Sequence, residues 1–127
     1  MTESWMTAVI GVTPNQNRYA FKAVTKLCEH KYPVTALGFR TGDVACDSIL
    51  TNWPKSIENL KVVSMYIGPS RQPEFYDYII ELNPKKVIFN PGTENTEFYK
   101  MLDSVGIEYE EACTLVLLST GAYSDGI

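Results

Sequence analysis

Short apolar runs alternate along the chain with longer amphipathic stretches. Five of these runs are bounded by turn-forming residues and are short enough to be buried strands. They cover residues 7–12, 34–38, 62–67, 86–89 and 107–110. Residues 39–61 carry no clear period, so they predict a long connection with room for one short edge strand around 44–50.

The amphipathic stretches between these runs have the spacing of helices. In the first, apolar residues recur at i, i+3, i+4, i+7 and i+8, which places them on one helical face. They are Ala20, Ala23, Val24, Leu27 and Cys28. Similar faces predict helices over 70–82 and 95–105, and a short last helix over 113–118.

Strands that alternate with crossover helices form a parallel sheet with helices on both faces. The pattern therefore predicts an α/β fold: a single Rossmann-like domain over residues 1–127, with three layers and a mostly parallel, five-stranded sheet. With the five strands numbered in chain order, we expect the order 3-2-1-4-5.

Composition narrows the class of protein. A length of 127 residues, 45% of them hydrophobic and 20% charged, suits one globular domain. Eleven Lys and Arg against fifteen Asp and Glu give a net charge of −4, which disfavours nucleic acid as a partner. The longest aliphatic run, residues 115–118, is far shorter than the roughly 20 residues that span a bilayer, so no membrane association is expected.

Two features favour a cytoplasmic location. Residues 1–6 lack the basic segment and apolar block of a signal peptide. The three cysteines, Cys28, Cys46 and Cys113, are an odd number without CxxC spacing, which is typical of a reducing compartment.

The most informative candidate site is the loop after the first strand. Ligands of open parallel sheets bind at the carboxyl ends of the strands, and this loop leads directly into the first helix. It contains no carboxylate, whereas Thr13, Asn15 and Asn17 offer neutral donors and Arg18 offers a guanidinium suited to phosphate. The loop therefore predicts an anion site, with an ordinary turn and a solvated arginine as the alternative.

The loop does not match a dinucleotide fingerprint. Gly11 is the only glycine of a GxGxxG pattern that is present. The second strand is followed by Phe39 and Arg40, where a dinucleotide site would have an acidic residue to bind a ribose 2′-hydroxyl. Arg40 favours an extra phosphate on the ribose, as in NADP or in the 3′-phosphorylated adenosine of coenzyme A. A surface arginine without a ligand is the alternative.

Four motifs in register resemble one known family. They are GVTPNQNRY at 11–19, YIGP at 66–69, FNPGTEN at 89–95 and EACT at 111–114. Together they resemble the stand-alone CoA-binding domain proteins, which are similar to the N-terminal CoA-binding domain of succinyl-CoA synthetase alpha subunits. The resemblance covers nearly the whole chain.

The resemblance implies a Rossmann-like domain that holds CoA or an acyl-CoA across the strand ends. The pyrophosphate would lie in the first loop, whose site residues are Gly11, Thr13, Pro14, Asn15, Asn17 and Arg18. A phosphate of the ADP moiety would meet Arg40, and the nucleotide would lie against Pro69 and Gln72. The pantetheine arm would pass Pro91 and Gly92.

The chain offers little catalytic machinery. Its one histidine, His30, falls at the far end of the first helix, and neither it nor the cysteines have zinc-site spacing. Cys113 follows the last strand, where its thiol could form a mixed disulfide with CoA or accept an acyl group, or could simply pack in the core.

These features predict non-catalytic binding of coenzyme A or an acyl-CoA. An NADP-dependent or thiol-dependent acyl-CoA enzyme and a ligand-free protein-interaction domain are the alternatives. The sequence leaves open whether the chain binds a partner subunit or forms a homodimer.

Overall fold

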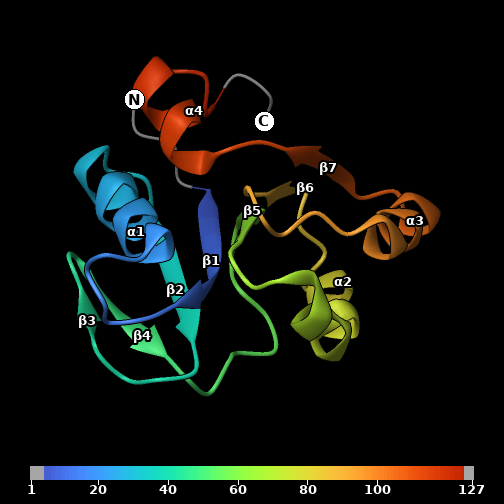
Figure 1. Ribbon diagram of the computed structural model, residues 1–127, viewed down its shortest axis with the longest axis horizontal. Coiled ribbons are helices and arrows are strands. Elements are labelled where there is room, and N and C mark those ends of the chain that lie inside the picture. The colour runs from blue at the N-terminus through green and yellow to red at the C-terminus, as the bar shows by residue number, and fades with distance from the viewer. Residues whose placement is uncertain (1–4, 125–127) are drawn as a thin grey trace.

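The computed structural model describes residues 5–124, and these residues form one sheet covered by helices on both faces (Figure 1). The predicted single domain also included residues 1–4 and 125–127, which lie outside the described residues. The strands are β1 (Met6–Val12), β2 (Val34–Gly38), β3 (Asp43–Val44), β4 (Asp47–Leu50), β5 (Leu60–Met65), β6 (Lys86–Phe89) and β7 (Glu108–Glu111). The helices are α1 (Tyr19–Glu29), the 3₁₀ helix η1 (Pro69–Phe75), α2 (Tyr76–Leu82), α3 (Thr96–Val105) and α4 (Thr114–Thr120).

The sheet confirms the α/β class and the mostly parallel arrangement, but the predicted strand number and order are wrong. The described residues form a seven-stranded sheet in the order β3-β4-β2-β1-β5-β6-β7. The third predicted strand, now β5, pairs with β1 and does not lie outside β2. That outer position belongs to β4, which pairs in parallel with β2 through Ala36 opposite Ile49.

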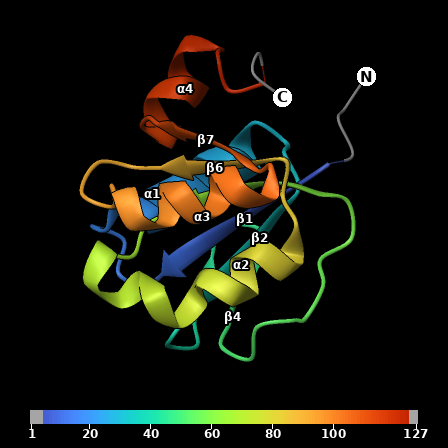
Figure 2. The ribbon, with the colours of Figure 1, turned by 90° about the vertical axis from the view of Figure 1, so that its right-hand side faces the viewer.

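The two layers of helices bury different faces of the sheet (Figure 2). β1 supplies both cores, because successive side chains of a strand point to opposite faces. An irregularity in the pairing between Ile10 and Val12 returns Val12 to the face of Val9. Val9 and Val12 pack in the core beneath α1 and α4. Ala8 and Ile10 pack in the core beneath α2 and α3. Among residues 5–124, no helix is long and apolar enough to cross a membrane.

A disulfide joins two of the three cysteines. Cys28, in the last turn of α1, is bonded to Cys46, in the turn between β3 and β4. Cys113 is free and half-buried. The odd number of cysteines did not predict this pair, because the fold brings together residues 18 positions apart that share no sequence motif.

Candidate functional site

A crevice opens at the carboxyl ends of β1 and β5. The helix that follows β1 covers one face of the sheet, whereas η1 and α2, which follow β5, cover the other, so the connections diverge between these two strands. This divergence is the usual ligand position in open α/β sheets. The cavity there measures about 350 Å³. Its lining residues are Gly11, Thr13, Arg18, Tyr19, Ala20, Phe39, Tyr66, Ile67, Gly68, Arg71, Pro91, Gly92 and Thr93.

Gly11 forms part of the crevice wall through a close backbone approach. Its φ of +100° lies in the region that favours glycine. A Cβ at this position would lie 2.9 Å from Cγ2 of Ile67 and 3.1 Å from the carbonyl carbon of Tyr66. The ends of β1 and β5 can therefore meet only because position 11 has no side chain.

We expect Gly11→Ala to destabilise the fold more than Gly92→Ala. Gly92 has a similar φ of +93°, but a Cβ there would meet no atom within 4 Å, so it is a matched control for backbone strain alone. Strain costs about 1–3 kcal/mol at either position, and overpacking adds about 1–3 kcal/mol at position 11. Urea unfolding of both variants measures the difference, and equal losses would contradict the close approach.

The loop from Thr13 to Arg18 leaves the start of α1 open. Arg18 is the N-cap residue of α1, no side chain caps this end, and the first turn holds no acidic residue. The free N–H groups and the helix dipole make such an end favourable for an anion. The Oδ1 atom of Asn15 accepts a hydrogen bond of 2.9 Å from the Asn17 amide, so the Asn15 side chain shapes the loop.

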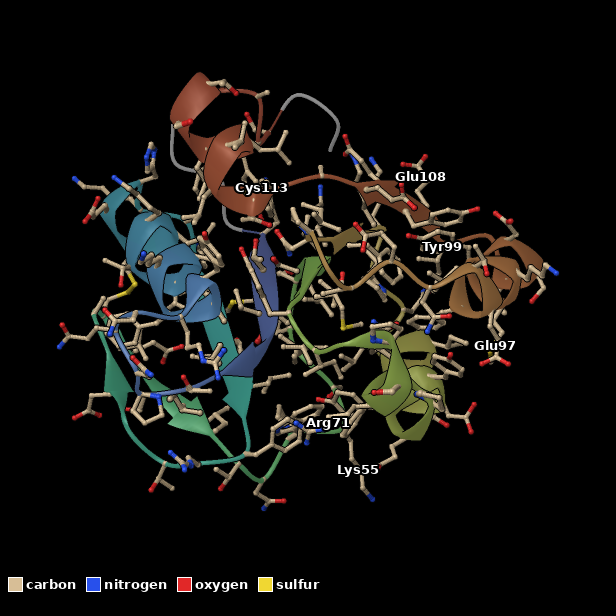
Figure 3. The ribbon with its side chains drawn as sticks, in the orientation of Figure 1. Lys55, Arg71, Glu97, Tyr99, Glu108 and Cys113 are labelled. Carbon is tan, nitrogen blue, oxygen red and sulfur yellow. A yellow bond between two sulfur atoms is a disulfide. The ribbon has the colours of Figure 1, made fainter. Side chains whose placement is uncertain are left out.

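Arg71 is a second cation in the crevice, and sequence reasoning missed it. Its guanidinium carbon lies 4.3 Å from the ring centroid of Phe39, an aromatic ring that is 44% exposed. Both residues line the cavity. Figure 3 shows Arg71 reaching from its loop toward the end of β2. Arg71 lies in η1, directly after β5, and its place just past the end of a parallel strand was the available signal.

The predicted site residues fall into two groups. Five of them line the crevice: Gly11, Thr13, Arg18, Pro91 and Gly92. The other six do not line the cavity: Pro14, Asn15, Asn17, Arg40, Pro69 and Gln72. The structure therefore brings the first loop and the Pro91–Gly92 loop together around one cavity.

Gln72 is fully buried outside the cavity lining, and its hydrogen bonds join two walls of the crevice. Its Nε2 donates to the carbonyl oxygens of Ile67 at 3.0 Å and Thr93 at 2.8 Å. Its Oε1 accepts from Asn95 at 2.9 Å. Asn95 in turn caps α3 by accepting from the Phe98 amide. Gln72 thus fixes the loop after β5 to the loop after β6.

Asn90, directly before Pro91, is a second buried side chain whose hydrogen bonds join separate elements. Its Nδ2 donates to Ser64 Oγ and to the carbonyl oxygen of Met65, both at 2.9 Å. Its Oδ1 accepts from the Thr114 amide at 2.8 Å. One side chain therefore links β5, the end of β6 and the start of α4.

Tyr66 lines the crevice on the side nearer α4. Its hydroxyl is buried and has no hydrogen-bond partner among residues 5–124. Burial raises its pKa, and the nearby Cys113 thiol raises this pKa further. Cys113 itself does not line the cavity.

Within residues 5–124, no group of three or more His, Cys, Asp and Glu is placed to hold a metal ion.

The fold and the crevice together define an α/β domain with a cationic cleft at the switch point of a mostly parallel sheet. The chain belongs to the CoA binding domain family, whose model matches residues 6–119. A search of curated proteins found no match.

Solved structures support the fold. One, described as an uncharacterized protein, is 41% identical, with a TM-score of 0.89 over 95% of this chain and 99% of its own. The cell-free ID.343 protein from Thermus thermophilus is 21% identical, with a TM-score of 0.77 over 93% of this chain and 90% of its own. A hypothetical protein from Pyrococcus horikoshii OT3 is 24% identical, with a TM-score of 0.77 over 90% of this chain and 81% of its own.

Proposed function

We propose that the crevice binds coenzyme A or an acyl-CoA without transforming it. The observation that carries this proposal is a cavity with two arginines, an uncapped helix start and no lining carboxylate, in a chain whose net charge is −4. Positive charge gathered locally against that overall charge favours a polyphosphate ligand. Membership of the CoA binding domain family supports CoA as that ligand.

The geometry suggests how the ligand would lie. Arg18 and the start of α1 would hold the pyrophosphate, and Arg71 would approach it from the opposite wall. The adenine would stack against the exposed ring of Phe39. The pantetheine arm would follow Pro91 and Gly92 past Tyr66.

Arg40 would select the 3′-phosphate. It is exposed at the end of β2, next to Phe39, and lies outside the cavity lining. A phosphate on the ribose of a stacked adenosine would project to this side of Phe39, where a flexible arginine can reach it.

The crevice favours binding over catalysis. Its ionisable lining residues are Arg18, Tyr19, Tyr66 and Arg71. General acid–base catalysis near neutral pH needs a group whose pKa lies near the working pH, such as histidine or a perturbed carboxyl. Burial moves the pKa of Tyr66 away from that range. A carrier, sensor or separate subunit of an acyl-CoA enzyme fits such a lining.

A thermal-shift series with CoA, acetyl-CoA, dephospho-CoA, NAD and NADP tests the proposal. A ligand at 100 times its Kd stabilises the native state by about 2.7 kcal/mol, which raises Tm by several degrees. We expect CoA and acetyl-CoA to give the largest shifts and dephospho-CoA a smaller one, with that difference lost in Arg40→Ala. A shift with NADP alone would favour a reductase, and no shift at all would favour a protein-interaction domain.

A further inference from the structure

The Cys28–Cys46 disulfide fastens a small hairpin to the far end of α1. The hairpin consists of β3, with two residues, and β4, with four, and Cys46 lies in the turn between them. Cys46 is exposed and Cys28 is half-buried. A disulfide bond appears beside α1 in Figure 3. An exposed disulfide is open to thiol exchange, whereas a buried one is protected.

The same hairpin supports two rims of the crevice. Directly before the hairpin is Gly42, where a Cβ would lie only 2.8 Å from Cβ of Pro14. Pro14 follows the crevice-lining Thr13 in the loop that leads to α1. The Ile49 amide donates to the Gly42 carbonyl oxygen at 2.8 Å, which fixes this contact to β4. Three residues before Gly42 is Phe39, which lines the crevice.

Apart from the disulfide, the hairpin is held by the parallel pairing of β4 with β2 and by a few side chains. Its buried apolar side chains are Val44 and Ile49, which join the core under α1. Asp47 accepts a hydrogen bond of 3.1 Å from the Ala36 amide. β4 is anchored to the sheet by its pairing with β2, whereas β3 is an edge strand of two residues that pairs with β4. The disulfide adds a covalent bond that holds the turn between them beside α1.

We infer that the Cys28–Cys46 disulfide is a thiol-redox switch that tunes the affinity of the crevice for its CoA ligand. This inference rests on the proposed function. With the bond closed, the hairpin holds Pro14 and Phe39 in place and the crevice is preorganised. With the bond open, the hairpin loosens, and the ligand must order both rims when it binds.

The chemistry is a balanced exchange with a dithiol reductant. A thiolate of the dithiol attacks Sγ of Cys46, the S–S bond breaks, and Sγ of Cys28 leaves as a thiolate that takes up a proton. The second thiol of the reductant, as its thiolate, resolves the mixed disulfide and releases Cys46 as a thiolate, which is protonated in turn. The protein gains two thiols, and the dithiol becomes a disulfide. A disulfide oxidant of the same class reverses the reaction.

The binding test uses S-ethyl-CoA, a thioether that has no free thiol to reduce the disulfide and no thioester to react with a thiol. We expect its Kd, measured by calorimetry, to rise about tenfold when dithiothreitol reduces the wild-type protein, and to recover after reoxidation, within the usual range of coupling between sites. Cys28→Ser/Cys46→Ser should bind like the reduced protein and ignore the reductant. Cys113→Ser, the matched control, should respond like the wild type. Equal Kd values in the two redox states would overturn the switch.

Hydrogen exchange of the ligand-free protein separates this inference from the proposed function. Reduction should speed amide exchange in residues 13–18 and 39–50 and leave β6 and α3 unchanged. Faster exchange with no ligand binding in either state would overturn CoA binding but leave the mechanical coupling standing. Unchanged exchange would overturn the coupling itself, whatever the ligand affinity.

Discussion

Replacing Arg18 and Arg71 together with alanine should weaken CoA binding by roughly 10²–10⁴-fold. The two guanidinium groups line one cavity that contains no carboxylate, so each would make charge-assisted hydrogen bonds to phosphate. Such bonds contribute about 1.5–3 kcal/mol each. The two losses sum to about 3–6 kcal/mol, and each 1.4 kcal/mol is a factor of ten in Kd. Isothermal titration calorimetry with CoA measures the effect.

The control for this prediction removes the same charge elsewhere. Lys26→Ala/Lys100→Ala also lowers the net charge by two, but Lys26 lies late in α1, Lys100 lies on α3, and neither lines the crevice. We expect this variant to change Kd less than threefold, because exposed charges beyond a Debye length of about 10 Å are screened at 0.1 M salt. An equal loss in the two variants would show that CoA responds to the overall charge and not to the crevice.

Replacing Asn90 with alanine should lower the free energy of unfolding by about 3–5 kcal/mol. The side chain is completely buried and makes three hydrogen bonds, so its removal leaves the Thr114 amide and the Met65 carbonyl without this partner. Each buried polar group left unsatisfied costs about 1–3 kcal/mol, and the vacated volume adds to the loss. Asn52→Ala, at an exposed position, should change stability by less than about 0.5 kcal/mol.

Guanidinium chloride unfolding of the two asparagine variants decides this prediction. The free energy of unfolding should fall with denaturant concentration at a similar slope in both variants, and the midpoint of unfolding should be lower in Asn90→Ala. That result would locate the effect in the native state. If Asn90→Ala lowered the free energy of unfolding by less than about 1 kcal/mol, the hydrogen bonds of Asn90 between β5, β6 and α4 would contribute little to stability. In that case the wall that carries Pro91 would be held by other contacts.

The sequence predicted the parts of the fold that have a repeated pattern. The strand predicted at 86–89 is β6 without change, and the helix predicted from Ala20 to Cys28 lies within α1. α1 has its buried residues at the period of a helix, and β6 is a short continuous run of buried residues. Both are signals that burial leaves in a sequence. The α/β class followed from the alternation of such elements.

The strand order could not be predicted, because it depends on an element with almost no pattern. β3 and β4 contribute one buried residue each, Val44 and Ile49, which is too few to define a period. Once β4 occupies the edge beside β2, the next strand must cross to the other side of β1. The sequence left room for one short edge strand around 44–50, where β4 lies, but did not place it beside β2, and the error in order follows from that.

Which single residues line the site also could not be predicted from the sequence. The cavity lies among the loops that follow parallel strands, as the general rule for such sheets leads one to expect. Which side chain in a loop faces the ligand depends on its local conformation. In the loop after β5, the 3₁₀ helix turns Gln72 into the core and leaves Arg71 exposed beside Phe39.

Glycine amides offer the most direct test of the claim that CoA binds in this crevice. Gly11, Gly68 and Gly92 line the cavity, whereas Gly106 and Gly121 end α3 and α4 and lie outside its lining. In a ¹⁵N-labelled protein titrated with CoA, we expect the amide signals of the first three to shift in a saturable way and those of the last two to stay in place. Saturable shifts confined to other residues, or no shifts at millimolar CoA, would contradict CoA binding in the crevice.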